Sequence, residues 1–107
     1  MKILLDENIS QTLLIDFGKH QVRTIDAMGW SGKKNGELLR LITHNKFDVL
    51  ITMDRNIKYQ QSIKNFPITI FVIASDSNRD DNVQPLINAV RKKLNGKINK
   101  GVFEIRK

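Results

Sequence analysis

The sequence predicts a single α/β domain built on a mainly parallel sheet. Short apolar runs alternate along the 107 residues with stretches whose apolar positions have helical spacing. The runs are apolar at consecutive positions, which is typical of strands buried on both faces of a parallel sheet. No linker, internal repeat or low-complexity segment interrupts the chain. We therefore expect one domain over residues 1–107, with helices covering each face of the sheet.

The first half of the chain is expected to form three strands and two helices. Apolar runs and an imperfect alternation predict strands over 3–5, 21–25 and 49–51. Apolar spacing predicts a helix over 9–17 that ends at Gly18. Glycines bound a predicted loop over 27–34, in which we expect Trp30 to fill the core rather than offer a platform for base stacking. A second helix then opens, with Asn35 as its expected N-cap.

The second half adds two strands and two helices. A short helix is expected over 57–63, and Pro67 precedes the most strand-like segment, 68–74. The last helix is expected over 79–95, because five apolar residues fall on one face: Val83, Leu86, Ile87, Val90 and Leu94. A glycine then introduces a final strand over 102–105.

Charge and composition narrow the classes of function. The chain carries 18 Lys and Arg against 11 Asp and Glu, a formal charge of +7. Residues 1–54 hold seven of each sign, so the whole surplus lies in the second half, which favours a polyanionic partner. The absence of cysteine excludes disulfides, thiolate metal sites and cysteine catalysis, and suits the cytoplasm, where we expect the protein. No apolar run reaches membrane-spanning length, so we expect no membrane partner.

Two predicted strands end in the same pattern, an apolar run followed by Asp-x-Asn. Asp6 follows the first run and Asp54 follows the strand over 49–51. Because the carboxyl ends of parallel strands share one edge of the sheet, these two aspartates should lie together. A helix that follows a strand begins at the same edge, which brings Glu37 there, and Asp76 follows the strand over 68–74.

Crowded carboxylates repel one another, and a divalent cation relieves the repulsion. Mg²⁺ and Mn²⁺ prefer oxygen ligands and are held by a few carboxylates together with substrate phosphate. The expected ligands are Asp6, Glu37 and Asp54, with Asp76 as a fourth candidate. Simpler roles are turn or capping chemistry for the aspartates and a favourable helix-dipole interaction for Glu37. The neighbours expected to cap or to orient these ligands are Asn8, Asn35, Thr52 and Asn56.

Three motifs resemble the small PIN-like proteins of prokaryotes, which are relatives of the PIN-domain ribonuclease toxins. The motifs stand in the family's order at residues 2–8, 29–39 and 50–56. The resemblance runs from residue 2 to about residue 73. It implies a PIN-like fold, a three-layer α/β/α sandwich with a mainly parallel central sheet. Many relatives carry Asp where this chain has Asn35 and Asn56.

The resemblance also implies a function. A PIN-like protein would be an endoribonuclease that depends on Mg²⁺ or Mn²⁺, with Asp6, Glu37 and Asp54 as catalytic residues and metal ligands. It would act on single-stranded RNA as the toxin of a toxin–antitoxin pair, inhibited by a cognate antitoxin. Losing two acids at Asn35 and Asn56 would weaken metal affinity. A homodimer is left open.

The basic residues offer candidate contacts with the RNA backbone. They are Arg55, Lys58, Arg91, Lys92 and Lys93. A simpler role for the last three is a solvated helix end, where cations suit the helix dipole.

Two rival functions remain open. A module that binds RNA or protein without cutting fits the two asparagines that replace acids. A receiver-like phosphoacceptor fits the acid pair Asp6-Glu7 after the first strand, the acceptor position at Asp54 and the hydroxyl of Ser75.

Overall fold

The computed structural model of the chain describes residues 1–7, 9, 20–59, 66–75 and 80–106. These residues form five strands, two α-helices and one short 3₁₀ helix. In chain order they are β1 (Lys2–Leu5), β2 (Gln21–Thr24), α1 (Asn35–His44), β3 (Val49–Thr52), η2 (Arg55–Tyr59), β4 (Thr69–Ile73), α2 (Asp80–Leu94) and β5 (Gly101–Ile105). Every predicted strand is therefore confirmed, and so is an α/β architecture.

The five strands form one parallel sheet in the order β2-β1-β3-β4-β5. The central register pairs Leu5 of β1 with Ile51 of β3. From β1 the chain adds β2 at one side of the sheet, and it then adds β3, β4 and β5 in turn at the other side. Such a sheet has a topological switch point between β1 and β3, and ligands of α/β proteins bind at the carboxyl ends of the strands there.

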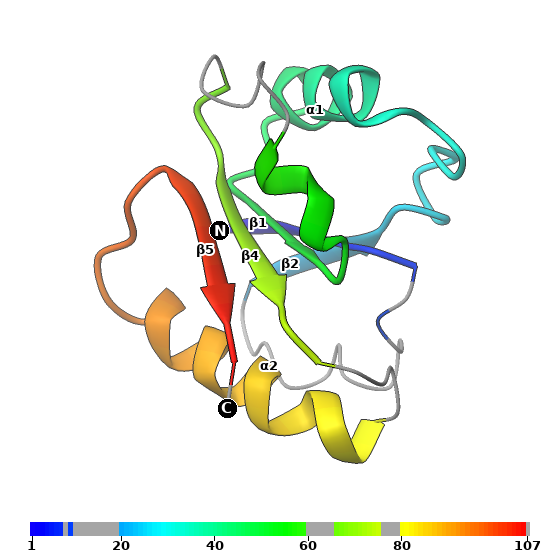
Figure 1. Cartoon of the computed structure of the whole chain (residues 1–107). Helices are drawn as coiled ribbons and strands as arrows, with labels where there is room; N and C mark the ends of the chain where they lie inside the picture. The colour runs from blue at the N-terminus through cyan, green and yellow to red at the C-terminus, as the bar shows by residue number, and fades with distance from the viewer. Residues whose placement is uncertain (8, 10–19, 60–65, 76–79, 107) are drawn as a thin grey trace.

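Buried side chains form a separate core on each face of the sheet, because successive residues of a strand point to opposite faces. Ile3, Leu5 and Ile51 face α2, whereas Leu4 and Leu50 face α1. Every residue of β3 and β4 is buried, as the uninterrupted apolar runs predict. Figure 1 shows α1 and α2 on different sides of the strands. Neither of these described helices is long and apolar enough to cross a membrane.

The loop before α1 is fixed by its aromatic residue. Trp30 is partly buried against the α1-side core and meets Phe47 edge to face, with ring centroids 6.0 Å apart. Its predicted role in the core is confirmed. Gly29 and Gly32 flank it with positive φ angles of 74° and 83°, a conformation that suits glycine.

The start of α1 differs from the prediction. The carbonyl of Lys34 accepts a hydrogen bond from the N–H of Leu38 at 2.8 Å, which is the first bond of the helical series. Lys34 is therefore the N-cap, without a side-chain capping bond, and Asn35 is the first helical residue. The assignment of Asn35 as N-cap is wrong by one position.

Two predicted helices fall on residues that the structure describes only in part. Of the helix expected over 9–17, only Ile9 lies within the described residues. The helix expected over 57–63 is represented by the 3₁₀ helix η2, which already begins at Arg55, and its remainder lies outside the described residues.

Candidate functional site

A threonine hydroxyl connects the two aspartates that the sequence places together. Thr52, the last residue of β3, donates from Oγ1 to Oδ2 of Asp6 at 2.6 Å. The same hydroxyl accepts from the backbone N–H of Asp54 at 3.0 Å. One side chain thus fixes Asp6 and Asp54 relative to each other across the switch point.

Asp6 is a buried carboxylate with only 5% of its surface exposed. Its backbone N–H donates to the carbonyl of Ile51 at 2.9 Å, which continues the ladder between β1 and β3 by one residue. Its Oδ2 also accepts from the N–H of Met53 at 3.3 Å. A buried charge is costly unless it is hydrogen-bonded or paired, so these donors explain how the fold holds a carboxylate here.

Asp54 combines a structural role with its place at the site. Its Oδ1 accepts from the N–H of Asn56 at 2.9 Å, and its carbonyl accepts from the N–H of Ile57 at 3.4 Å. These bonds begin η2, so the capping role considered from the sequence is present. The side chain of Asn56 is exposed beside it.

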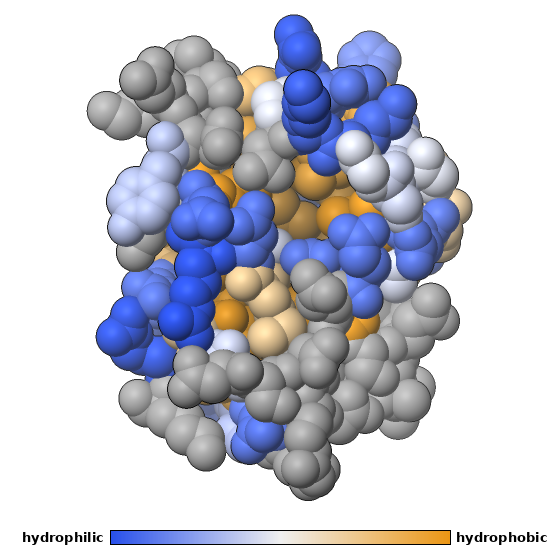
Figure 2. All heavy atoms as spheres, turned by 45° about the vertical axis from the view of Figure 1, so that its right-hand side comes forward, coloured by the Kyte–Doolittle hydropathy of each residue, from blue (hydrophilic) through white to orange (hydrophobic). Residues whose placement is uncertain are grey.

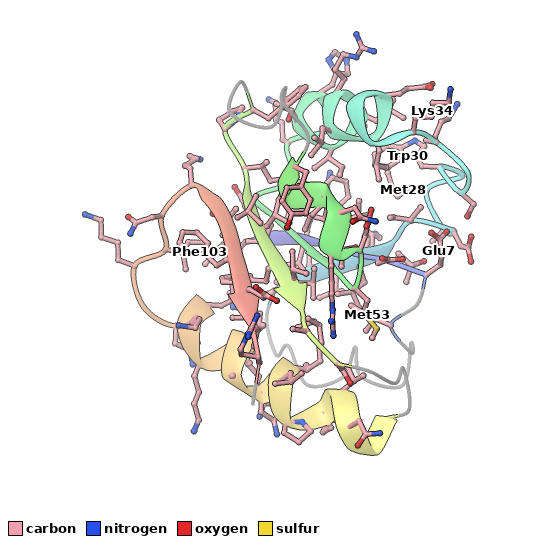
Figure 3. The ribbon with its side chains drawn as sticks, viewed as in Figure 1. Glu7, Met28, Trp30, Lys34, Met53 and Phe103 are labelled. Carbon is pink, nitrogen blue, oxygen red and sulfur yellow. The ribbon has the colours of Figure 1, made fainter. Side chains whose placement is uncertain are left out.

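A cleft of about 340 Å³ opens beside these residues. We call it the acid cleft; the described residues that line it are Asp6, Glu7, Ile25, Lys33, Leu38, Leu50, Thr52, Asp54 and Ile57. Four of the nine are buried aliphatic side chains, and three are acids. Figure 3 shows Glu7 on the side of the molecule that comes forward in Figure 2, where apolar atoms lie in a hollow between hydrophilic side chains.

Glu37 is not among the described residues that line the acid cleft. It occupies the first turn of α1, as expected, but its carboxylate is exposed and pairs with Lys33 at 3.2 Å. It lines a separate surface depression, together with Arg40, Leu41, Thr43, His44 and Phe66. Within the described part of the chain, no three His, Asp or Glu side chains come close enough together to hold a metal ion.

The residues that do come together fit a metal site with two carboxylates. Mg²⁺ keeps several waters and is commonly held by one or two carboxylates plus substrate phosphates, so it does not need a complete protein cage. Asp6 and Asp54 meet this requirement: Thr52 donates to the carboxylate of Asp6, and the N–H of Asn56 donates to the carboxylate of Asp54. Hydrogen bonds that orient metal-binding carboxylates are a regular feature of such sites.

The predicted RNA contacts fall at two ends of the sheet. Arg55 directly follows Asp54 and lines a small hollow with Val72, Val102 and Glu104. Arg91 is partly buried and donates to Oδ1 of Asn88 at 3.3 Å, whereas Lys92 and Lys93 are exposed. Lys93 shares a groove with Thr69, the first residue of β4. The end of α2 therefore lies beside the strand starts, at the opposite end of the sheet from the acid cleft.

The remaining candidates are described incompletely. Asn8 and Asp76 lie outside the described residues. Asn35 and Lys58 are placed in α1 and η2 by their backbone, and their side chains are not among those described.

Two charged residues of the acid cleft, Glu7 and Lys33, were not among the predicted metal ligands or RNA contacts. Glu7 follows Asp6 within the first Asp-x-Asn pattern, so its position beside an expected ligand was an available signal. Lys33 lies in the loop before α1, at the carboxyl edge of the sheet. The spacing of four residues between Lys33 and Glu37 was a signal that their side chains form an ion pair.

Comparisons of the chain with protein-family models, with curated proteins and with solved structures found no match.

Proposed function

We propose that the chain is a metal-dependent endoribonuclease of PIN-like type, with the three-layer α/β/α sandwich of that family. The observation that carries the proposal is the Asp6–Thr52–Asp54 connection at the switch point of the sheet. Two carboxylates fixed at this position, in a cleft that also contains Glu7 and Lys33, suit a site for a cation and a phosphate.

Each residue has a defined part in this proposal. Asp6 and Asp54 would hold Mg²⁺ or Mn²⁺, and the hydroxyl of Thr52 connects the carboxylate of Asp6 to the main chain of Asp54. When bound, the ion supplies Lewis-acid stabilisation of the charge that develops on the phosphodiester. The apolar floor of the cleft limits water around the reacting group, which strengthens electrostatic interactions there. Because Asn56 is neutral, the site carries less negative charge than the sites of PIN-like proteins that have Asp at this position. We therefore expect weaker metal affinity.

The proposal includes a toxin–antitoxin context. The resemblance to the ribonuclease toxins supports it, together with the positive charge of the second half of the chain, which suits an acidic antitoxin segment as well as RNA. Single-stranded RNA is the proposed substrate.

Metal-dependent cleavage tests the proposed function. We expect the protein to cut labelled single-stranded RNA in Mn²⁺ or Mg²⁺ and to stop in excess EDTA. Asp54→Asn should lower the rate by roughly 10²-fold, because it removes one of the two ligand charges. Asp48→Asn is the matched control, since Asp48 precedes the same strand at its other end and bonds the N–H of Lys2. Cleavage that persists in EDTA, or equal rates in both variants, would contradict the proposal.

One observation favours a second candidate, the receiver-like phosphoacceptor. The strand order 2-1-3-4-5 is shared by flavodoxin-like domains, which include receivers, and Ser75 follows β4 as that function requires. Incubation with a small phosphodonor followed by intact mass measurement separates the two. A single phosphate on Asp54 would support the phosphoacceptor, and the nuclease proposal expects none. RNA binding in EDTA without cleavage in Mn²⁺ would instead support the non-cutting module.

A further inference from the structure

The acid cleft has an electrostatic problem as an RNA site. Asp6, Glu7 and Asp54 line it, and RNA brings further negative charge along its backbone. A divalent ion neutralises part of the carboxylate charge, but the phosphates still need a positive partner at the rim. Among the described residues lining the cleft, Lys33 alone carries positive charge.

The backbone of Lys33 is well anchored to the core. Its N–H donates to the carbonyl of Trp30 at 3.2 Å, and Trp30 packs against Phe47. The next residue, Lys34, is the N-cap of α1. A lysine held at this place keeps its flexible side chain close to the cleft while its main chain stays fixed.

Glu37 is the resting partner of this lysine. The ion pair joins Nζ of Lys33 to Oε1 of Glu37 at 3.2 Å, with side chains 39% and 52% exposed. Ion pairs as exposed as this one are weak, so an arriving phosphate can replace the carboxylate. Glu37 itself lines the separate depression with Arg40 and Phe66, so it contacts the lining of the acid cleft through its ion pair with Lys33.

We propose that Lys33 binds a substrate phosphate at the acid cleft and that Glu37 is the positioning residue that holds Lys33 there, in place of the metal-ligand role that the sequence suggests for Glu37. The inference rests on the proposed function, because it takes RNA as the ligand. Lysine is well suited to this task, since its ammonium group is a compact charge that binds phosphate without a fixed geometry.

RNA binding by neighbouring lysine variants tests the role of Lys33. The probe is a short fluorescein-labelled single-stranded RNA, its anisotropy measured in Ca²⁺ over a range of salt, with gels confirming that it stays intact. Lys33→Met should weaken binding about fivefold and flatten the salt dependence by about 0.7 in the log–log slope. Lys34→Met removes the same charge one residue away and should change affinity less than about twofold. Figure 3 labels Lys34 at the start of α1. Equal effects of the two variants would overturn the inference.

Metal binding tests the role of Glu37 without RNA. In calorimetric titrations with Mn²⁺, Glu37→Gln should keep the wild-type affinity within about twofold, whereas losing a true ligand costs about tenfold or more. A loss in Glu37→Gln as large as that in Asp54→Asn would overturn the positioning role.

The two proposals fail in distinguishable ways. Wild-type protein that binds the probe through Lys33 but does not cut RNA in Mn²⁺ contradicts the nuclease function and supports the phosphate site. Wild-type protein that cuts RNA with equal affinity in the Lys33→Met and Lys34→Met variants supports the nuclease and overturns the role of Lys33.

Discussion

Asp6→Asn is expected to lower metal-dependent RNA cleavage by about 10²–10³-fold while leaving the fold intact. The amide keeps an oxygen that can accept from Thr52 and Met53, which both donate to Oδ2 of Asp6. The variant can therefore keep these two hydrogen bonds while it removes the negative charge. The rate is measured on labelled single-stranded RNA in Mn²⁺, and folding by thermal denaturation.

The thermal measurement decides how the activity result is understood. A midpoint near that of the wild type, with activity lost, assigns the loss to the missing charge. Activity close to wild type in a folded Asp6→Asn protein would contradict the assignment of Asp6 as a metal-holding residue.

Thr52→Val is expected to weaken both the fold and the metal site. Valine has nearly the shape of threonine but no hydroxyl, so Oδ2 of Asp6 loses one donor and the N–H of Asp54 loses the acceptor at 3.0 Å. Removing a hydrogen-bond partner from a buried polar group costs about 1–3 kcal/mol, measurable by urea denaturation. The carboxylate of Asp6 also loses the hydroxyl that connects it to the main chain of Asp54, so Mn²⁺ affinity should fall about 10–100-fold.

Two control variants separate these effects. Thr52→Ser keeps the hydroxyl and should retain most of the Mn²⁺ affinity. Thr69→Val removes another buried threonine hydroxyl, which donates to the carbonyl of Asn99 at 2.8 Å, beside the start of β4. It should lower stability without changing Mn²⁺ affinity. Equal Mn²⁺ affinity in Thr52→Val and the wild type would show that Thr52 does not orient the site.

The parallel sheet and the Asp6–Asp54 pair were predictable from sequence for one physical reason. A strand such as Val49–Thr52 that is buried at every position must be covered on both faces. In α/β proteins the helices that connect parallel strands provide this cover. Parallel strands then align their carboxyl ends, so acids that follow two strands must share an edge. Whether the two strands are neighbours depends on sheet order, and the hydrogen bond from Asp6 to Ile51 shows that β1 and β3 are adjacent.

The position of Glu37 could not be predicted in the same way. Residues on a helix rotate by about 100° per position, so a small change in where α1 begins redirects each side chain. The helix begins one residue earlier than expected, with Lys34 in place of Asn35 as its N-cap. The apolar face that includes Leu39 packs on the sheet, and Glu37 is left exposed beside Lys33. The prediction that Glu37 lies in the first turn of α1 was correct, but it did not determine whether the side chain lines the acid cleft.

The basic residues of α2 show a similar limit. The helix expected over 79–95 correctly placed Arg91, Lys92 and Lys93 in its last turn. Topology then determines their place, because α2 starts after the carboxyl end of β4 and returns to the amino end of β5. Charge counts along a chain do not show that α2 runs back across the sheet. They therefore could not predict that these basic residues lie at the opposite end of the sheet from the acid cleft.

The central claim is that Asp6 and Asp54 together hold one divalent ion, and calorimetric titration with Mn²⁺ tests it most directly. The account predicts one Mn²⁺ per wild-type chain, affinity reduced about tenfold or more in both Asp6→Asn and Asp54→Asn, and unchanged binding in Asp48→Asn. Mn²⁺ binding of equal strength in the wild type and in a folded Asp54→Asn variant would contradict it.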